Sequence, residues 1–165
     1  MIVYLVGMPG AGKSVVGEEL AGRLGVPFID LDEEIERSTG SAVRDIFARE
    51  GEAAFRAREA AALVEASTHD PAVVACGGGV VLEPANRITL RNTGVAVFLD
   101  VPLERLRERV HPAADRPLIH ETGDLERLLR AREPLYREFA GHVVNGDGTP
   151  DEVAEAIVEE LRWSA

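Results

Sequence analysis

The sequence predicts an α/β fold, a P-loop three-layer αβα sandwich built around a parallel sheet. Short apolar runs alternate with stretches of helical periodicity along all 165 residues, which is typical of parallel strands covered by helices on both faces. The first apolar run leads directly into the glycine-rich segment GMPGAGKS at residues 7–14, and further glycine-rich or acidic segments follow later strands. Because ligands of such sheets bind outside the carboxyl ends of the strands, we expect the functional site there.

The first half of the chain contains two expected strands. The apolar run IVYLV predicts a strand at residues 2–6, and the helix expected at residues 15–24 ends at Gly25, which suits a left-handed position after a helix. A second strand is expected at residues 26–31, where it ends in acidic residues. Small and glycine residues at 39–41 and at 51 then interrupt the periodic pattern, so we expect helices at residues 33–38, 42–50 and 52 to about 67.

The second half contains three more expected strands, at residues 71–76, 95–100 and 142–145. Helices are expected at residues 84–90, 103–110, 125 to about 139 and 150–163. Asp124 is expected to cap the third of these helices, and Thr149, Pro150 and Glu152 form a capping signal for the last. Residues 111–123 contain two prolines and little periodicity, which predicts a mobile lid.

The composition limits the classes of protein to which the chain can belong. With 45% apolar and 28% charged residues it suits one compact domain, residues 1–165, and no apolar run reaches the roughly 20 residues of a membrane span. Since a basic leader is missing and the only cysteine, Cys76, suits a buried strand end, we expect a cytoplasmic protein without membrane partners. The net charge of −11 opposes binding to nucleic acid. We also expect a monomer.

The segment at residues 7–14 is a P-loop and predicts a nucleoside triphosphate as ligand. Gly7, Gly10 and Gly12 allow the backbone to turn its N–H groups around phosphate oxygens. Lys13, the only lysine among 18 basic residues, would reach the β and γ phosphates, and the hydroxyl of Ser14 can bind Mg²⁺. A strand before the loop and a helix after it make a ligand-free glycine turn the weaker interpretation.

Two acidic residues follow the second expected strand. If Asp30, Leu31 and Asp32 continue that strand, their side chains alternate, and both carboxylates project to the same side. One carboxylate can then face a metal ion while the other orients an acceptor hydroxyl, which are the two needs of phosphoryl transfer. The alternative is that these acids simply open the solvated segment at residues 32–34.

Two further segments carry weaker signals. Arg56 and Glu59 share one helix face, and from spacing alone a surface ion pair is the favoured interpretation. Gly77, Gly78 and Gly79 follow a buried strand, and three successive glycines weaken a structure unless the backbone approaches something closely. Binding of a small substrate there is favoured over a plain turn.

The arginines around the expected lid could serve a transferring phosphoryl group. Arg109 and Arg116 bracket or lie in that segment, and Arg132 lies in the helix that follows. Arginines that close over a phosphoryl group balance its developing charge. The histidines lack metal-ligand spacing with one another or with Cys76, so we assign them no metal site.

With these motifs in place, the chain resembles the shikimate kinases over nearly its full length. The resemblance rests on the P-loop, Asp30-Leu31-Asp32, Gly51-Glu52 with Phe55-Arg56 and Glu59, the triple glycine, Arg116-Pro117-Leu118, and Arg132 four residues before Tyr136. It implies transfer of the γ-phosphate of ATP to the 3-hydroxyl of shikimate in the route to aromatic amino acids. It also implies five parallel strands in the order 2-3-1-4-5, a short substrate-binding helical segment at about 31–60, and a lid at about 111–123.

The resemblance also implies roles for individual residues. Lys13, Asp32 and Arg116 would be catalytic, and Ser14 and Asp30 would serve Mg²⁺. The residues implied for ATP are Gly10, Ala11, Gly12, Lys13, Ser14, Val15, Arg109, Arg116 and Pro150, of which Arg109 and Pro150 would sandwich the adenine. The residues implied for shikimate are Asp32, Arg56, Gly77, Gly78, Gly79 and Arg132, the two arginines on its carboxylate.

The chain departs from the family pattern at three places, and two alternative functions stay open beside the resemblance. Val15 replaces a frequent hydroxyl residue, Ala75 precedes the glycines where a hydroxyl often occurs, and residues 145–149 lack basic side chains, so we expect modest nucleotide affinity. A gluconate-type sugar-acid kinase has a similar size and P-loop. A non-catalytic nucleotide-binding regulator could use the same fold, although it has less need of Asp32 and Arg116.

Overall fold

The computed structural model describes residues 1–110, 117–120 and 122–163, which build one five-stranded parallel sheet. Its order is β2-β3-β1-β4-β5, which confirms the expected order 2-3-1-4-5. The strands are β1 (Ile2–Val6), β2 (Phe28–Asp30), β3 (Ala72–Ala75), β4 (Gly94–Asp100) and β5 (His142–Asn145). All five residues of β1 are buried between β3 and β4, which explains the unbroken apolar run at the start of the chain.

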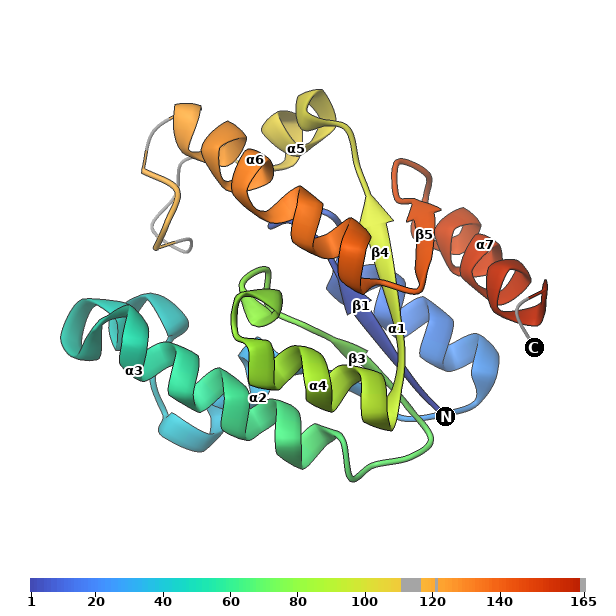
Figure 1. Cartoon of the computed structure of the whole chain (residues 1–165), viewed down its shortest axis with the longest axis horizontal. Coiled ribbons are helices and arrows are strands. Elements are labelled where there is room, and N and C mark those ends of the chain that lie inside the picture. The colour runs from blue at the N-terminus through green and yellow to red at the C-terminus, as the bar shows by residue number, and fades with distance from the viewer. Residues whose placement is uncertain (111–116, 121, 164–165) are drawn as a thin grey trace.

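Helices cover both faces of the sheet, as the predicted sandwich requires (Figure 1). They are α1 (Lys13–Leu24), α2 (Leu31–Thr39), α3 (Val43–Ala66), α4 (Pro84–Thr93), α5 (Leu103–Arg109), α6 (Thr122–Phe139) and α7 (Pro150–Trp163), with a 3₁₀ turn at Val80–Leu82. The helices α1 and α7 pack against each other, whereas α4 and α6 lie together with the 3₁₀ turn against the other face. Within the part of the chain that the structure describes, no helix is long and apolar enough to cross a membrane.

Several helix ends depart from the predicted bounds, and backbone chemistry explains them. α1 begins at Lys13 rather than residue 15, because Gly12, with φ 86°, caps it without a side chain. Gly25 ends α1 in the predicted left-handed conformation. α6 begins at Thr122 rather than residue 125, so Asp124 lies in its first turn instead of capping it. The predicted capping box of α7 is confirmed, since Thr149 N–H donates to Glu152 Oε2 at 2.8 Å and Glu152 N–H donates to Thr149 Oγ1 at 3.2 Å.

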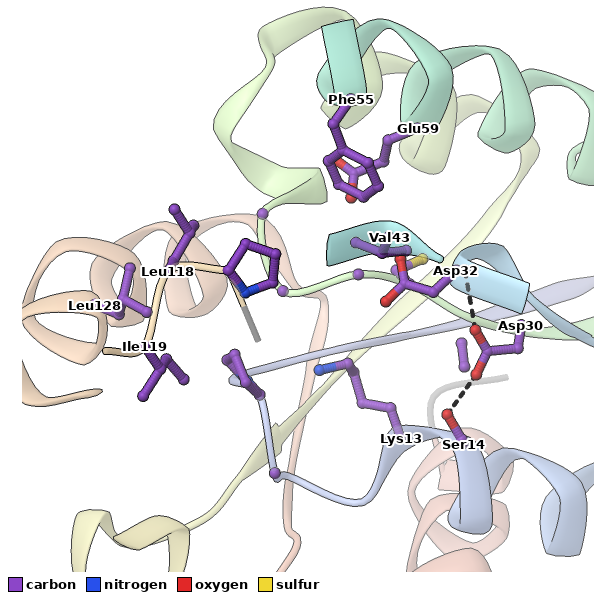
Figure 2. Close-up of a pocket in the computed structure, with 18 of the residues that line it drawn as sticks. Lys13, Ser14, Asp30, Asp32, Val43, Phe55, Glu59, Leu118, Ile119 and Leu128 are labelled. Atoms are coloured by element: carbon purple, nitrogen blue, oxygen red, sulfur yellow. Dashed lines mark hydrogen bonds between the residues drawn. The ribbon is translucent and has the colours of Figure 1, made fainter. Parts of the chain in front are cut away.

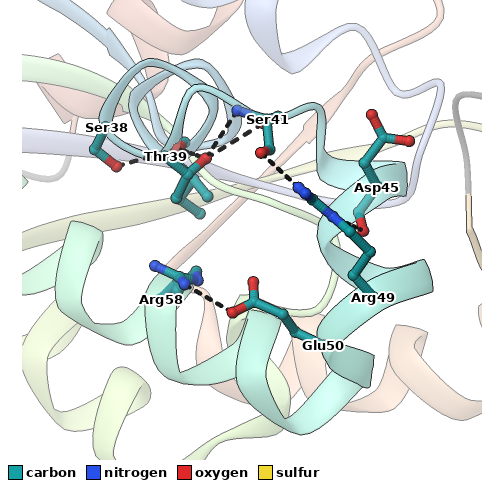
Figure 3. A network of polar contacts seen from close by, with 8 residues as sticks. Ser38, Thr39, Ser41, Asp45, Arg49, Glu50 and Arg58 are labelled. Carbon is teal, nitrogen blue, oxygen red and sulfur yellow. Dashed lines mark hydrogen bonds and ion pairs between the residues drawn. The ribbon is translucent and has the colours of Figure 1, made fainter.

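The expected substrate-binding segment at about 31–60 comprises α2 and the first half of α3. Residues 42–50 and the helix after them join into α3, which is kinked at Gly51 (φ 84°, ψ 172°). Figure 3 shows the polar contacts that support this arrangement: Arg58 donates to Glu50 across the kink at 2.9 Å, and Arg49 donates to Ser41 Oγ at 2.6 Å. A small core of Ile35, Ile46 and Phe55 fixes α2 on α3. The segment therefore has its own packing and projects beside the carboxyl ends of the strands.

Most of the predicted lid, including Arg116, lies outside the described residues. Its described part consists of residues 117–120 and the start of α6.

Candidate active site

A cleft of about 490 Å³ opens at the carboxyl ends of the strands, where ligands were expected (Figure 2). Most of the predicted site residues line it together: Gly10, Gly12, Lys13, Ser14, Val15, Asp30, Asp32, Arg56, Gly77, Gly78, Gly79, Arg109 and Arg132. Ala11 is buried behind the loop, and Pro150 is exposed at the first turn of α7, outside the cleft lining. The structure thus gathers residues from widely separated parts of the sequence into one space.

The P-loop has the backbone conformation of a phosphate cradle. Gly7, Gly10 and Gly12 have φ values of 152°, 83° and 86°, and a Cβ at Gly10 would lie 2.4 Å from Val110 Cγ2. The N-terminus of α1 therefore opens into the cleft, where its N–H groups and dipole favour an anion. Lys13 Nζ donates to the carbonyl oxygens of Gly7 (2.7 Å) and Met8 (2.8 Å), which holds the ammonium group over the loop.

Asp30 joins the P-loop to the substrate-binding segment. Its carboxylate accepts hydrogen bonds from the backbone N–H groups of Asp32 (3.0 Å) and Glu33 (3.3 Å), and from the hydroxyl of Ser14 (Figure 2). The expectation that residues 30–32 continue the strand is wrong, because this capping bond starts α2 at Leu31. The two carboxylates nevertheless line the same cleft, Asp30 from the strand end and Asp32 from the first helical turn.

The carboxylate of Asp32 points into the cleft near Lys13 (Figure 2). Its Oδ1 is buried and has no hydrogen-bond partner among the described residues. Burial, reinforced by the charges of Asp30 and Glu59 and opposed by that of Lys13, raises the pKa of Asp32 to about 6. An acceptor that is buried and unsatisfied at a cleft wall is suited to a ligand that brings its own hydroxyl donor.

Arg56 and Glu59 form an ion pair in which the arginine is only 20% exposed and the acid is buried, so the favoured interpretation as a surface ion pair is wrong. Glu59 is fully buried, and Arg56 Nη1 donates to its Oε1 at 3.0 Å. Their helix packs this face against the glycine-rich loop rather than toward solvent, which spacing alone could not reveal. Burial raises the pKa of Glu59, with Arg56 opposing that shift, and removal of one partner of such a pair typically costs about 3–5 kcal/mol.

Aromatic rings hold the other side of the Arg56 guanidinium. Its Cζ lies 5.3 Å from the ring centroid of Phe55 and 5.9 Å from that of Phe47. Both distances lie within the range of cation–π attraction. Arg56 is therefore fixed by rings and a carboxylate before any ligand binds.

The triple glycine exists because side chains crowd its backbone from three directions. An added Cβ would lie 2.6 Å from Glu59 Oε2 at Gly77, 3.0 Å from Arg132 Nη1 at Gly78, and 2.2 Å from Arg56 Nη1 at Gly79. The expectation of a close approach is confirmed, and the approaching groups are the site's own charged side chains. Two guanidinium groups from α3 and α6 thereby meet at one loop.

Arg132 reaches the cleft from α6 and Arg109 from α5. Arg132 is only 4% exposed, which is unusual for an arginine, and its charge opposes the rise in the pKa of Glu59. Arg109 donates to the Gly10 carbonyl at 3.3 Å and lies 3.8 Å from Asp147, so it joins the P-loop to the segment before α7.

Sequence reasoning missed an apolar wall of the cleft. Leu118, Ile119 and Leu128 lie together on one side of it (Figure 2). The other lining residues to which the sequence assigned no role at the site are Pro9, Glu36, Val43, Phe47, Phe55, Glu59, Ala75, Cys76 and Pro117. Their position in the sequence could have indicated some of these residues, since Phe55 directly precedes Arg56 and residues 117–119 directly follow Arg116. Cys76 is buried, as expected of a strand end.

Together, the phosphate loop, the paired arginines and the unsatisfied Asp32 beside an apolar wall define a P-loop kinase of small molecules. A model of the shikimate kinase family matches residues 9–162. The chain belongs to the shikimate kinase family, and it is accordingly an ATP-dependent kinase of aromatic amino acid biosynthesis.

Individual relatives agree with this assignment. A shikimate kinase of Aromatoleum aromaticum is 45% identical, over 98% of this chain and 95% of the relative. The structure of the Acinetobacter baumannii shikimate kinase in complex with shikimate has a TM-score of 0.95 and 38% identity, over 99% of this chain and 93% of that one. A gluconokinase of Sinorhizobium meliloti, with a TM-score of 0.65 and 24% identity over 99% and 92% of the two chains, shares the fold alone.

Proposed function

We propose that this kinase transfers the γ-phosphate of ATP to the 3-hydroxyl of shikimate, with ATP on the P-loop side of the cleft and shikimate between α3 and α6. The observation that carries the proposal is the pair of arginines, Arg56 and Arg132, brought to one glycine loop of a protein with a net charge of −11. Glu59 balances the charge of Arg56, and Arg132 adds a second guanidinium that is only 4% exposed at the same loop. Arginine offers paired donors that match a carboxylate, so an anionic acceptor suits this site.

On the nucleotide side, the backbone N–H groups from Gly10 to Val15 bind the phosphates, and Lys13 contacts the β and γ phosphates. All of these residues except Ala11 line the cleft where α1 begins, and this supports the proposal. Arg109 and Pro150 enclose the adenine. Support for that part is the ion pair of Arg109 with Asp147, three residues before Pro150.

The residues present fit a magnesium ion. Ser14 and Asp30 are hard oxygen donors in direct contact with each other at the P-loop. The described residues hold no group of three or more acidic, histidine or cysteine side chains able to bind a metal alone, so Ser14 and Asp30 would share Mg²⁺ with phosphate oxygens and water. The ion, when bound, neutralises charge on the β and γ phosphates.

On the acceptor side, Arg56 and Arg132 bind the shikimate carboxylate, and the N–H groups of the triple glycine hold the ring hydroxyls. Asp32 accepts a hydrogen bond from the reacting hydroxyl and orients its oxygen toward the γ-phosphate. As the new P–O bond forms, Asp32 takes the proton of the hydroxyl, the bond from the γ-phosphorus to the bridging oxygen breaks, and ADP leaves. The buried and unsatisfied Oδ1 of Asp32 supports this role. The role of Arg116 at the phosphoryl group stays a prediction. We further propose a cytoplasmic monomer.

A coupled assay of ADP release tests the proposal directly. We expect turnover with shikimate and much lower turnover with quinate, gluconate or nucleoside monophosphates at equal concentration. Preference for gluconate would reassign the acceptor, and absence of turnover with all of them would favour a binding protein without transferase activity.

A further inference from the structure

The hydroxyl of Tyr136 binds the backbone of the glycine loop from beneath. Tyr136 is fully buried in α6, and its hydroxyl donates a hydrogen bond to the carbonyl oxygen of Gly78. Its ring stacks on that of Phe98 in β4, with 5.1 Å between the centroids and 22° between the planes. The phenol is thus fixed on the central part of the sheet before it reaches the loop.

The same peptide is contacted by Arg132. Arg132 and Tyr136 are four residues apart in α6 and therefore lie on one helix face. A Cβ at Gly78 would lie only 3.0 Å from Arg132 Nη1, so the guanidinium packs against the backbone whose carbonyl binds Tyr136. One helix face therefore supplies both an arginine of the shikimate site and the donor that fixes the neighbouring peptide.

The phenol stays a donor over the whole working range of pH. Burial raises the pKa of Tyr136 to about 12, and Arg132 opposes that shift. A peptide whose carbonyl accepts a hydrogen bond becomes a better N–H donor, because hydrogen bonds in a chain polarise one another. A ligand that accepts a hydrogen bond from the glycine loop in the cleft should therefore also strengthen the hydrogen bond from Tyr136 to the Gly78 carbonyl.

We propose that Tyr136 is a positioning residue for shikimate: its hydroxyl holds the Gly78 peptide at a fixed distance from Arg132, so that the loop and the guanidinium receive the substrate together. This inference rests on the assignment of the cleft to shikimate. Without the hydroxyl, the Gly78 carbonyl loses its donor and the peptide turns toward cleft water, which misplaces the loop relative to Arg132.

The first test compares two matched variants. Tyr136→Phe keeps the ring and its stacking but removes the hydroxyl, and we expect the KM for shikimate to rise at least fivefold while the KM for ATP stays within twofold. Tyr4→Phe is the control, since Tyr4 is equally buried and its hydroxyl bonds Thr93 Oγ1 at 2.7 Å in another part of the fold. Both variants should lower the Tm, but Tyr4→Phe should leave the KM for shikimate within twofold of the wild type.

A second test needs no variant of Tyr136 and remains available if Tyr136→Phe does not fold. The chain has two tyrosines, so tyrosine labelled with ¹³C at Cζ gives two resonances, which Tyr4→Phe assigns. Saturating shikimate should shift the resonance of Tyr136 and leave that of Tyr4 in place. An unchanged Tyr136 resonance, or an unchanged KM in a folded Tyr136→Phe protein, would overturn the inference, whereas a wild type inactive on shikimate would instead overturn the assigned function.

Discussion

Lys13 binds two carbonyl oxygens of its own loop, so its ammonium group is already in place when the phosphates arrive. We expect Lys13→Ala to lower kcat at least 100-fold, because one charge contact to the transferring group contributes roughly 2.7–4 kcal/mol in the transition state. Steady-state kinetics measure this loss. A Tm close to that of the wild type would show that the loop survives, and near wild-type turnover would contradict the role of Lys13.

Arg132 tests whether the site recognises a carboxylate rather than hydroxyls alone. Lysine keeps the charge but loses the paired donors of arginine, so Arg132→Lys should raise the KM for shikimate at least tenfold, a loss of about 1.4 kcal/mol. The KM for ATP should stay within about threefold. As a check on the unmodified protein, shikimate methyl ester should be a poor substrate, and equal kcat/KM for acid and ester would exclude carboxylate recognition.

At the scale of elements, the glycine loop leaves just enough room for the Arg56 side chain of α3. Gly79 has φ −93° and ψ 2°, which alanine can adopt, but its Cβ would lie 2.2 Å from Arg56 Nη1. Gly79→Ala should therefore displace the Arg56 guanidinium and raise the KM for shikimate at least fivefold, as measured by initial rates, with little change in the KM for ATP.

Gly22→Ala provides the control for the glycine-loop variant. Gly22 lies in α1, and an added Cβ would meet no atom within 4 Å apart from its chain neighbours and the backbone of its own helix. Alanine in a helix should stabilise the protein by roughly 0.5–1 kcal/mol without changing either KM. Unaltered shikimate binding by Gly79→Ala would show that Arg56 can move without consequence.

The sequence predicted those elements whose signals are local. The P-loop, the capping box of α7 and the apolar strands depend on neighbouring residues, and the structure confirms them. Asp30 ends β2 as expected, but Leu31 and Asp32 were wrongly expected to continue the strand. An acidic residue at a strand end is compatible with both a longer strand and a helix N-cap, and the hydrogen bond from Asp32 N–H to Asp30 distinguishes the two. The order of strands came from family resemblance, since periodicity does not fix it.

Parts of the site lay beyond local signals for a different reason. Burial of Glu59 and the contact between Tyr136 and Gly78 depend on which helices meet over the glycine loop. Spacing along the chain reports which residues share a helix face, but it does not report which element that face meets. Resemblance supplied Arg56 and Arg132, whereas the rings that hold Arg56 had no comparable signal.

At the scale of the whole molecule, substrate binding should be visible as stability. Shikimate at 100 times its dissociation constant should stabilise the protein by about 2.7 kcal/mol, which corresponds to a Tm increase of roughly 5–10 °C for a chain of this size. At the same concentration Arg132→Lys should show about half that increase, while the increase caused by ADP should be unchanged. Gluconate should have no effect on the Tm, and an equal effect would contradict the assigned acceptor.

Cys76 lines the cleft just after β3 but is only 2% exposed, and burial raises the pKa of its thiol, which disfavours reaction in the folded state. A thiol reagent can therefore modify the protein only when the sheet opens around that strand. Because the chain has no other cysteine, the rate at which the thiol is modified measures how often such openings occur, and no engineered label is needed. ADP and shikimate together should lower the rate of modification of Cys76.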